Sequence, residues 1–305
     1  MSENIIKNRS EILFIYDVKD ANPNGDPVDE NKPRIDEETG INYVTDVRLK
    51  RTIRDYLHDY KDKEIFIIEH REESGNLKTK EKRLEDFNKN LKEIINRCID
   101  IRLFGATIAV EKNTVSITGP VQFKFGRSLH KVDMTYIKGT TVMPSGAERK
   151  QGTFTERYIL RYSLIAFYGV VNENAARQQN LNLTEEDIDL MLEAMWNGTK
   201  NLISGSKFGQ MPRLLVQVIN KTANHYIGEL DKFIHLKTEK NDEAIRDISE
   251  VKIDLTELLQ ILRKNKENIE RIKLKVDDRL ICLSDGIEKN IYEALGDFHV
   301  ESLNI

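Results

Sequence analysis

The chain has 305 residues and a formal net charge of −4 at pH 7, with 47 Lys or Arg against 51 Asp or Glu. This length supports a large core in one elaborated domain or two, and the charge balance excludes a uniformly basic nucleic-acid binder. Two isolated cysteines, Cys98 and Cys282, exclude a cysteine zinc site or a disulfide framework and fit a reducing compartment. Because no stretch resembles a signal peptide or approaches the roughly 20 apolar residues of a membrane span, we expect a cytoplasmic protein without a membrane partner.

The N-terminal part opens with an apolar run that ends in a turn. Residues 12–18 are almost all apolar, which predicts a strand buried on both faces. The segment Asn22-Pro23-Asn24-Gly25-Asp26-Pro27 ends this strand, because proline has no amide hydrogen and Asn-Gly readily adopts positive φ. After a long polar loop, Thr45 or Asp46 is expected to cap a helix.

This helix is predicted to have a basic face and an apolar face. Lys50, Arg51, Arg54 and His58 share one side at about 100° per residue, and the apolar residues share the other. Basic side chains next to a Gly-containing loop suit a chain of phosphates. The candidate phosphate ligands are therefore Asn22, Asn24, Gly25, Lys50, Arg51 and Arg54, although a solvated basic face is an equally consistent interpretation.

The middle of the chain predicts alternating strands and helices. A strand is expected at 64–69, a helix at 79–101, and strands at 101–110 and 115–125. The apolar run 158–171 is either a central strand or a buried helix. A capping box at Thr184 predicts a helix that Gly198 ends, with Trp196 in the core.

High glycine content in one segment and weak apolarity in another predict less regular structure in both. The loop Ser204-Gly205-Ser206-Lys207-Phe208-Gly209 lacks the spacing of a phosphate-binding P-loop, yet Ser206 and Lys207 could meet phosphates there. Residues 129–154 bury little by pattern, which is typical of a mobile surface loop or a hairpin. The last third predicts strands at 251–253, 272–276 and 300–303 and helices at 255–264 and 287–295.

Several of these segments, in order, resemble one family. FIYDVKDANPNGDP, PRIDEETG and VTDVRLKRTIR look like the start of the CRISPR-associated Cas family seven proteins, the Cascade backbone of type I systems, and most of all its I-B and I-C branches. The resemblance continues in ITGPVQFKFGRSL, GTFTERYILRYSLIAFYGVV and MWNGTKNLISGSKFGQMPRLLVQV. It covers roughly residues 11–220.

The resemblance implies an α+β fold in a single elaborated domain, 1–305. Its parts would be an RRM-like (ferredoxin-like) palm with an antiparallel sheet (11–70, 101–128 and 154–305), a helical insertion (71–100) and a thumb β-hairpin (129–153). In such proteins the thumb folds over the next subunit and displaces a base of the guide at regular intervals. Thr140, Thr141, Val142 and Met143 would lie near its tip.

The resemblance also implies a binding protein rather than an enzyme, with no cofactor and no metal. Copies of the chain would line one crRNA, other Cascade subunits would occupy the ends, and target DNA would pair with the guide, so that base pairing reads the sequence. By this resemblance Gln122 and Ser128, in ITGPVQFKFGRSL, join the RNA-binding residues.

Two other functions remain open at this stage. Clustered aspartates, including Asp17, Asp20 and Asp26, could form a hard-metal site in a ribonuclease backbone subunit of type III style, although such clusters usually serve caps and Asx-turns. The same turn imitates the opening of an EF-hand, but Asn31 occupies the twelfth position, where calcium loops have Glu. A generic single-stranded RNA-binding module without a CRISPR role is the remaining alternative.

Overall fold

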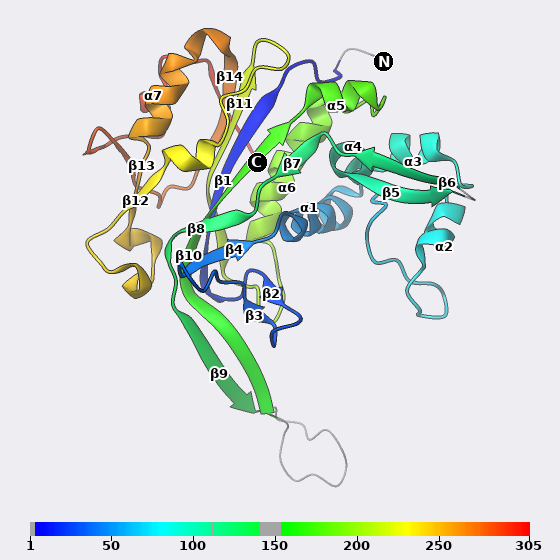
Figure 1. Ribbon diagram of the computed structural model, residues 1–305, viewed down its shortest axis with the longest axis horizontal. Coiled ribbons are helices and arrows are strands. Elements are labelled where there is room, and N and C mark those ends of the chain that lie inside the picture. Colours follow the sequence, from blue (N-terminus) through cyan, green and yellow to red (C-terminus); the bar gives the residue numbers. More distant parts are fainter. Residues whose placement is uncertain (1–3, 111–112, 141–153) are drawn as a thin grey trace.

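A nine-stranded sheet forms the centre of the computed structural model, which describes residues 4–110, 113–140 and 154–305 (Figure 1). Its main path runs β17-β14-β11-β1-β10-β8-β4, while β7 and β9 also pair with β10. Among these described strands only the pair β14 and β17 is parallel. The strands are β1 (Ser10–Ala21), β4 (Ile41–Val44), β7 (Val121–Phe123), β8 (Gly126–Lys131), β9 (Met134–Thr140), β10 (Phe154–Val171), β11 (Gln210–Asn220), β14 (Ile269–Val276) and β17 (Val300–Ser302).

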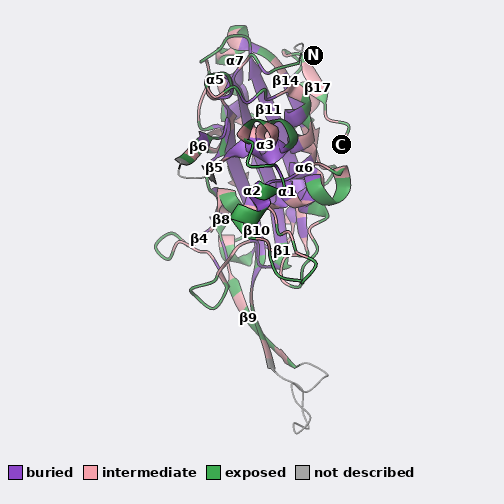
Figure 2. Cartoon of the chain, turned by 90° about the vertical axis from the view of Figure 1, so that its right-hand side faces the viewer, coloured by how far each residue is buried: buried purple, intermediate pink, exposed green. Residues whose placement is uncertain are grey.

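The strand β1 is buried on both faces, as its apolar run predicted. Phe14 and Tyr16 belong to the apolar core on one side of the sheet, whereas Leu13 and Ile15 belong to the core on the other side. Its neighbour β10 resolves the earlier alternative, because the run at 158–171 is part of one long strand and not a helix. The sheet is therefore the middle layer of the molecule, and Figure 2 shows its buried residues in purple between more exposed elements.

Two long helices, α1 (Asp46–Lys61) and α6 (Glu185–Lys200), cover one face of the sheet, and the short α5 (Glu173–Gln178) precedes α6. Thr45 caps α1, and the capping box predicted at Thr184 is confirmed. Gly198 does not end α6 as expected. A Cβ at Gly198 would lie only 3.0 Å from the Cβ of Tyr56, so glycine there permits close packing of α6 on α1. Trp196 is buried, as expected.

The C-terminal third covers the other face, where Leu258, Leu259 and Leu262 of α7 pack on β11 and β14 in the second core. The strands expected near 252, 272 and 300 and the helix near 256–264 are confirmed. The helix expected at 287–295 is wrong in its first half, because 287–288 pair with β15 and the helix begins only after the Asn290 cap. The elements are η1 (Leu230–Phe233), β12 (His235–Lys237), η2 (Asp242–Ala244), η3 (Ile248–Glu250), β13 (Lys252–Asp254), α7 (Thr256–Lys264), η4 (Lys266–Asn268), β15 (Cys282–Ser284), β16 (Ile287–Glu288) and α8 (Ile291–Ala294).

A third apolar cluster holds together an insertion beside α1, defined here as residues 64–118 (Figure 1). The single helix expected at 79–101 is wrong, because Asn88 and Lys89 have positive φ and Asn90 caps a new helix. The strand expected at 101–110 begins as a helix and becomes a strand only at Gly105. The elements are α2 (Lys80–Glu85), α3 (Leu91–Arg97), α4 (Ile99–Phe104), β5 (Gly105–Val110) and β6 (Asn113–Thr118).

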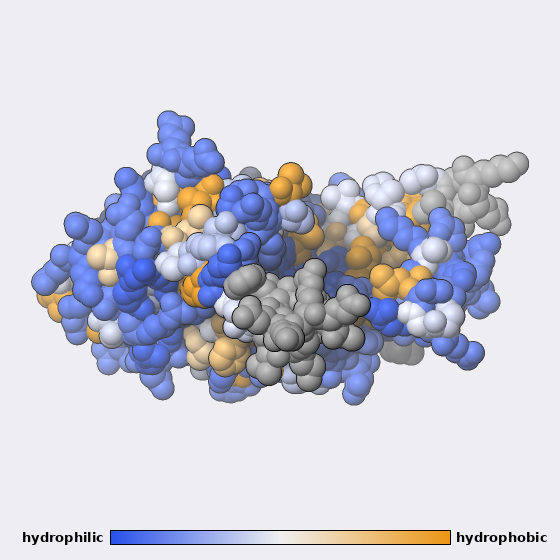
Figure 3. Space-filling view, turned by 90° about the horizontal axis from the view of Figure 1, so that it is seen from below, coloured by the Kyte–Doolittle hydropathy of each residue, from blue (hydrophilic) through white to orange (hydrophobic). Residues whose placement is uncertain are grey.

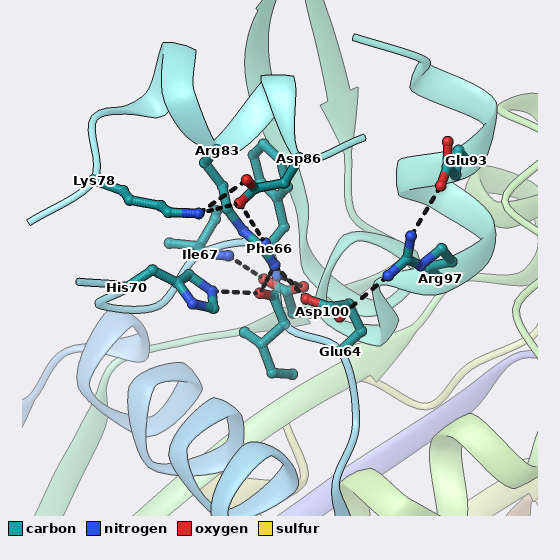
Figure 4. A network of polar contacts seen from close by, with 11 residues as sticks. Glu64, Phe66, Ile67, His70, Lys78, Arg83, Asp86, Glu93, Arg97 and Asp100 are labelled. Carbon is teal, nitrogen blue, oxygen red and sulfur yellow. Dashed lines mark hydrogen bonds and ion pairs between the residues drawn. The ribbon is translucent and has the colours of Figure 1, made fainter. Parts of the chain in front are cut away.

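The strand expected at 64–69 is also wrong. The backbone nitrogens of Phe66 and Ile67 donate to the carboxylate of Asp100, at 2.8 and 3.0 Å, and the carbonyl of Ile65 accepts from Arg83 (Figure 4). Side chains of the insertion thus satisfy backbone groups that a neighbouring strand would satisfy in a sheet. An apolar pattern alone does not distinguish these two partners.

A hairpin projects from the sheet where β9 pairs with the first half of β10 (Figures 1 and 2). The paired arm begins at Met134, because β8 and its buried His130 belong to the sheet. Tyr136 and Ile137 on the arm are exposed. Thr140 is exposed near the end of the described arm, and Thr141, Val142 and Met143 lie outside the described residues.

Within the described parts of the chain, no helix has the length and apolarity needed to cross a membrane.

Candidate nucleic-acid interface

The turn at residues 22–26 is held by its own polar side chains. The amide of Asn22 donates to the carbonyl of Asn31 at 2.7 Å. Asp26 accepts from the backbone nitrogen of Val28 at 3.0 Å and from the guanidinium of Arg34 at 2.8 Å. These bonds fix the loop that connects β2 (Gly25–Asp26) with β3 (Lys32–Pro33). Asp26 thus braces both the loop and a nearby basic side chain.

Gly25 is required in this turn for a different reason from the one expected. Its φ is not positive, so conformational freedom is not the cause. A Cβ at Gly25 would instead lie 2.0 Å from Oδ1 of Asn31, which approaches from the other side of the loop. Any larger residue here must displace Asn31 and with it the backbone of the turn.

A second loop, residues 204–209, packs against this turn. The backbone nitrogen of Asn22 donates to the carbonyl of Ser206 at 2.7 Å, and the ammonium of Lys207 donates to the carbonyl of Asn22 at 3.4 Å. Gly209, at a φ of +107°, brings this loop against β1, where a Cβ would lie 2.6 Å from the carbonyl oxygen of Lys19. The structure therefore brings Asn22, Ser206 and Lys207 together from segments nearly 190 residues apart, as their assignment to one site requires.

Arg48 and Lys207 form the electropositive centre of this region. Lys207 is half-buried, and its pKa is lowered first by burial and then by the positive charge of Arg48. Arg48 donates to the hydroxyl of Thr52 at 2.9 Å, and burial lowers its pKa too. In the part of the chain that the structure describes, neither cation has an ion-pair partner. Two neighbouring cations that have no ion-pair partner among the described residues favour the binding of an anion.

The basic face expected on α1 is exposed only in part. Lys50 and Arg54 are buried, each with a relative exposure below 10%. Lys50 pairs with Asp46 at 2.9 Å in the first turn, and Arg54 pairs with Asp100 at 3.1 Å. The expectation of a shared open face is therefore wrong for these two residues, because the insertion covers the side of α1 on which they lie.

Arg51 is the more exposed member of that set. Its side chain is 41% exposed and pairs with Asp55 at 2.7 Å. Glu69 lies 3.6 Å from the same guanidinium. A phosphate at Arg51 would have to compete with both carboxylates, whereas Asp55 acts on Arg48 only from beyond ion-pair distance.

Gln122 and Ser128 lie away from the two loops. Gln122 is opposite Val170, at the end of β10 that is remote from the turn, and its amide donates to the carbonyl of Gly119 at 2.8 Å. Ser128 is buried, donates to the carbonyl of His130 at 2.7 Å and accepts from the backbone of Asn42. The structure does not bring either residue to Arg48 and Lys207.

Aromatic side chains lie on one of the two loops and at the base of the hairpin. Phe208, next to Lys207, is 71% exposed. Arg157, at the base of the hairpin, donates to the carbonyl of Gly205 at 2.7 Å. The neighbouring Tyr158 stands against Tyr136 with 5.0 Å between ring centroids, and its hydroxyl donates to Glu30. Proteins that bind single-stranded nucleic acid commonly combine aromatic rings, on which bases stack, with cations that contact the backbone.

The aspartates of β1 and of the loop that follows it serve separate local structures. Asp17 is buried between Arg213 and Tyr162, and burial raises its pKa although Arg213 opposes this effect. Asp36 accepts from two backbone nitrogens of its own turn. Among the described residues, no three His, Cys, Asp or Glu side chains gather in a way that could hold a metal ion.

Comparison with known proteins decides the family. The family model described as CRISPR-associated protein Cas7 matches residues 8–256. The chain belongs to the Cas7 family. It is 32% identical over 306 aligned residues to a CRISPR-associated protein Cas7 from Haloferax volcanii, covering 90% of this chain and 88% of that protein. The family indicated by the N-terminal segments is thus confirmed.

Solved structures agree with the Cas7 fold. A chain of a CRISPR RNA-guided surveillance complex in a pre-nicking state superposes with a TM-score of 0.54 at 12% identity, over 91% of this chain and 96% of that chain. A chain of another CRISPR RNA-guided surveillance complex gives a TM-score of 0.51 at 16% identity, over 92% and 95%. At these identities the similarity demonstrates the mixed α and β fold with its central sheet.

Arg48 is the residue of this Cas7 chain that sequence reasoning missed. A shared helical face had favoured Lys50, Arg51 and Arg54 instead. The position of Arg48 in the first turn, directly after the Thr45 cap, was the signal that could have identified it, because anions bind at the N-terminal ends of helices.

Proposed function

We propose that this Cas7 chain is the crRNA-binding backbone subunit of a type I-B-like Cascade complex in the cytoplasm. Several copies polymerise along one guide RNA, together with other Cascade subunits, and present the guide for pairing with target DNA. The observation that carries this proposal is the pair Arg48 and Lys207, two cations without a carboxylate partner beside the turn at residues 22–26. The CRISPR RNA-guided complexes among the structural neighbours are consistent with it.

We further propose that the central sheet is an RRM-like palm and the projecting hairpin its thumb. The order β11-β1-β10-β8, with α1 and α6 on one face, corresponds to the βαββαβ arrangement of ferredoxin-like folds. The thumb proposal rests on the exposed apolar and aromatic residues of the arm, Met134, Tyr136 and Ile137, which bury little in the isolated chain. A neighbouring copy would cover them.

Salt dependence of RNA binding tests the phosphate site. Labelled single-stranded RNA is titrated with protein over a range of salt concentrations, and log K is plotted against log salt. Arg48→Ala and Lys207→Ala should each lower the slope by about 0.7 for every phosphate that the variant no longer neutralises, similarly for all RNA sequences. Lys264→Ala, at an exposed lysine of α7 on the other face, is the matched control and should keep the wild-type slope. Unchanged slopes in both site variants would refute the proposal.

The chain is also proposed to bind RNA without cutting it. Asp26, in the turn at residues 22–26, is engaged by Arg34 and by the backbone of its own turn. Guide-loaded protein is incubated with labelled complementary RNA, with Mg²⁺ or Mn²⁺ and with EDTA in parallel. Intact target in every lane supports this proposal. Metal-dependent cleavage that Asp26→Asn abolishes would establish the ribonuclease alternative instead.

A further inference from the structure

A groove of about 700 Å³ lies between the N-terminal half of α1 and residues 66–80 of the insertion. Its size falls within the range of about 300–1,000 Å³ that is usual for small-ligand sites. Figure 3 shows hydrophobic side chains in a hollow between the centre of the molecule and the insertion on the right. The lining includes Asn24, Thr45 and Arg48, so one end of the groove opens at the candidate nucleic-acid interface.

The groove combines positive charge with an open apolar wall. Its lining holds six Lys or Arg side chains and one carboxylate, that of Glu69. Val47, Ile67 and Leu77, which also line it, are 65%, 44% and 52% exposed. Exposed large apolar side chains facing a basic groove indicate a ligand that has both an anionic and an apolar part.

Two of the six cations are free to meet an anion. Lys78 and Arg83 pair with Asp86 within the insertion (Figure 4). Arg54 pairs with Asp100, and Arg51 pairs with Asp55, so these four cations already have carboxylate partners. Within the described residues, Arg48 and Lys80 have no ion-pair partner, and Lys80 is exposed.

Hydrogen bonds hold part of the groove wall in place. Asp100, completely buried, accepts from the backbone nitrogens of Phe66 and Ile67 and thereby fixes the backbone at Ile67. Arg83 donates to the carbonyl of Ile65 at 2.9 Å and supports the same segment. The entropy cost of ordering the walls around a ligand would therefore be small.

We propose that this groove is a second nucleic-acid contact, in which one nucleotide of the bound strand lies with its phosphate at Arg48 and Lys80 and its base against Ile67 and Leu77. The inference rests on the proposed function. It extends the RNA site from the two loops to the insertion, as the shared lining residue Arg48 suggests. The charge of the groove suits either a nucleotide or an acidic peptide. The groove also adjoins the two loops, as one continuous RNA strand would require, whereas a separate acidic peptide would not need this position. We therefore favour a nucleotide.

Photo-cross-linking tests the proposal. A uridine-rich RNA that contains 4-thiouridine is bound to the full chain and irradiated, and cross-linked peptides are identified by mass spectrometry. We expect cross-links within residues 66–80 in addition to those in the two loops. Leu77→Ser and Ile67→Ser should weaken RNA binding about fivefold each, which corresponds to about 1 kcal/mol of apolar burial. Lys80→Ala should reduce the salt slope by about 0.7.

Matched controls separate the groove from general effects on the surface. Ile203→Ser replaces an apolar residue that is 79% exposed outside the groove, and Lys82→Ala removes an exposed lysine of α2 that pairs with Glu72. Both should bind RNA as the wild type does. Unfolding of each groove variant by urea shows whether the fold is intact, which is expected because Ile67 and Leu77 are 44% and 52% exposed.

The outcomes distinguish this inference from the proposed function. Cross-links confined to residues 22–26 and 204–209, with wild-type affinity in the groove variants, would overturn the inference alone. A wild-type chain that binds no RNA would overturn both. Binding of a decaglutamate peptide that Leu77→Ser weakens, without RNA cross-links in the groove, would overturn the inference in favour of an acidic protein partner.

Discussion

The side-chain oxygen of Asn24 accepts hydrogen bonds from both the backbone nitrogen and the hydroxyl of Thr45, at 2.9 and 3.0 Å. The same Thr45 hydroxyl accepts from the backbone nitrogen of Arg48 at 3.3 Å. One amide side chain therefore connects the turn at residues 22–26 with the cap of α1 and with the cation that we place at the RNA backbone. The turn and the helix N-terminus are held as one unit.

This connection predicts different results for two substitutions of Asn24. Asn24→Ala leaves the Thr45 nitrogen without its partner and should lower the free energy of unfolding by about 1–2 kcal/mol. Asn24→Asp keeps an accepting oxygen and adds a negative charge at a helix N-terminus, so the free energy of unfolding should change little. The same charge should repel a phosphate and weaken RNA binding. Urea unfolding and RNA titration of both variants measure the two effects, and RNA affinity that simply follows stability would contradict the prediction.

Asp100 is expected to be essential for docking the insertion. It is completely buried, pairs with Arg54 and accepts from two backbone nitrogens. Asp100→Asn would leave a buried guanidinium without a counter-charge, and we expect a loss of about 3–5 kcal/mol in the free energy of unfolding. Asp86→Asn, at a partly exposed pair on the same insertion, should cost at most about 1 kcal/mol. Equal losses in the two variants, measured by urea unfolding, would be inconsistent with this assignment.

His130 should make stability depend on pH. Its ring is buried against Tyr162, and Nε2 accepts from the backbone nitrogen of Leu164 at 3.3 Å, which requires the neutral ring. Burial lowers its pKa, although the Lys131 carbonyl and Asp242 oppose this effect. Because the folded-state pKa lies below the unfolded value, the contribution is fully present above about pH 6.5 and is lost as the pH falls toward the folded-state pKa.

The measurement for His130 is urea unfolding at several pH values from 8 down to about 5.5. The wild type should lose stability over this interval. His130→Gln preserves an acceptor for Leu164 without a titrating ring, so its stability should depend less on pH. The same dependence in both proteins would show that another group is responsible.

The hairpin should serve assembly more than folding. Replacing residues 138–156 with a short Gly-Ser turn removes a segment whose described residues are largely exposed, and we expect the free energy of unfolding to change by less than about 1 kcal/mol. Under the proposed function, loading of several copies on a long RNA should lose its cooperativity, while a single copy should still bind a short RNA. Loss of the cooperative thermal transition would show instead that this segment belongs to the core.

Sequence patterns predicted the elements that an apolar run or local capping chemistry decides. The strand β1, the caps of α1 and α6, and the core position of Trp196 follow from local chemistry that the fold does not alter. One error lies where a polar side chain from a distant segment decides the outcome, and another lies where the backbone turns without a glycine. Asp100 satisfies the backbone of residues 66–67 in place of a strand, and Asn88 and Lys89 divide a helix at positive φ without a glycine.

The candidate site was predictable only in part for the same reason. Asn22, Asn24, Ser206 and Lys207 were selected from loop chemistry, and the structure brings them together. Lys50 and Arg54 were selected from a helical projection, which does not show that the insertion covers that face. The partner of each cation, and not its spacing along the helix, determines whether it is free to bind a phosphate.

The strand β10 has a mechanical consequence. It runs without a break from the buried pairing of Phe167 with Phe14 to the pairing of the half-buried Tyr158 with the exposed Tyr136. A pull on the hairpin along the strand direction would load the whole β1–β10 ladder in shear, so that many hydrogen bonds resist at once. A sideways pull would instead separate β9 from β10 one pair at a time, so force spectroscopy should find the hairpin stiff along its axis and weak across it.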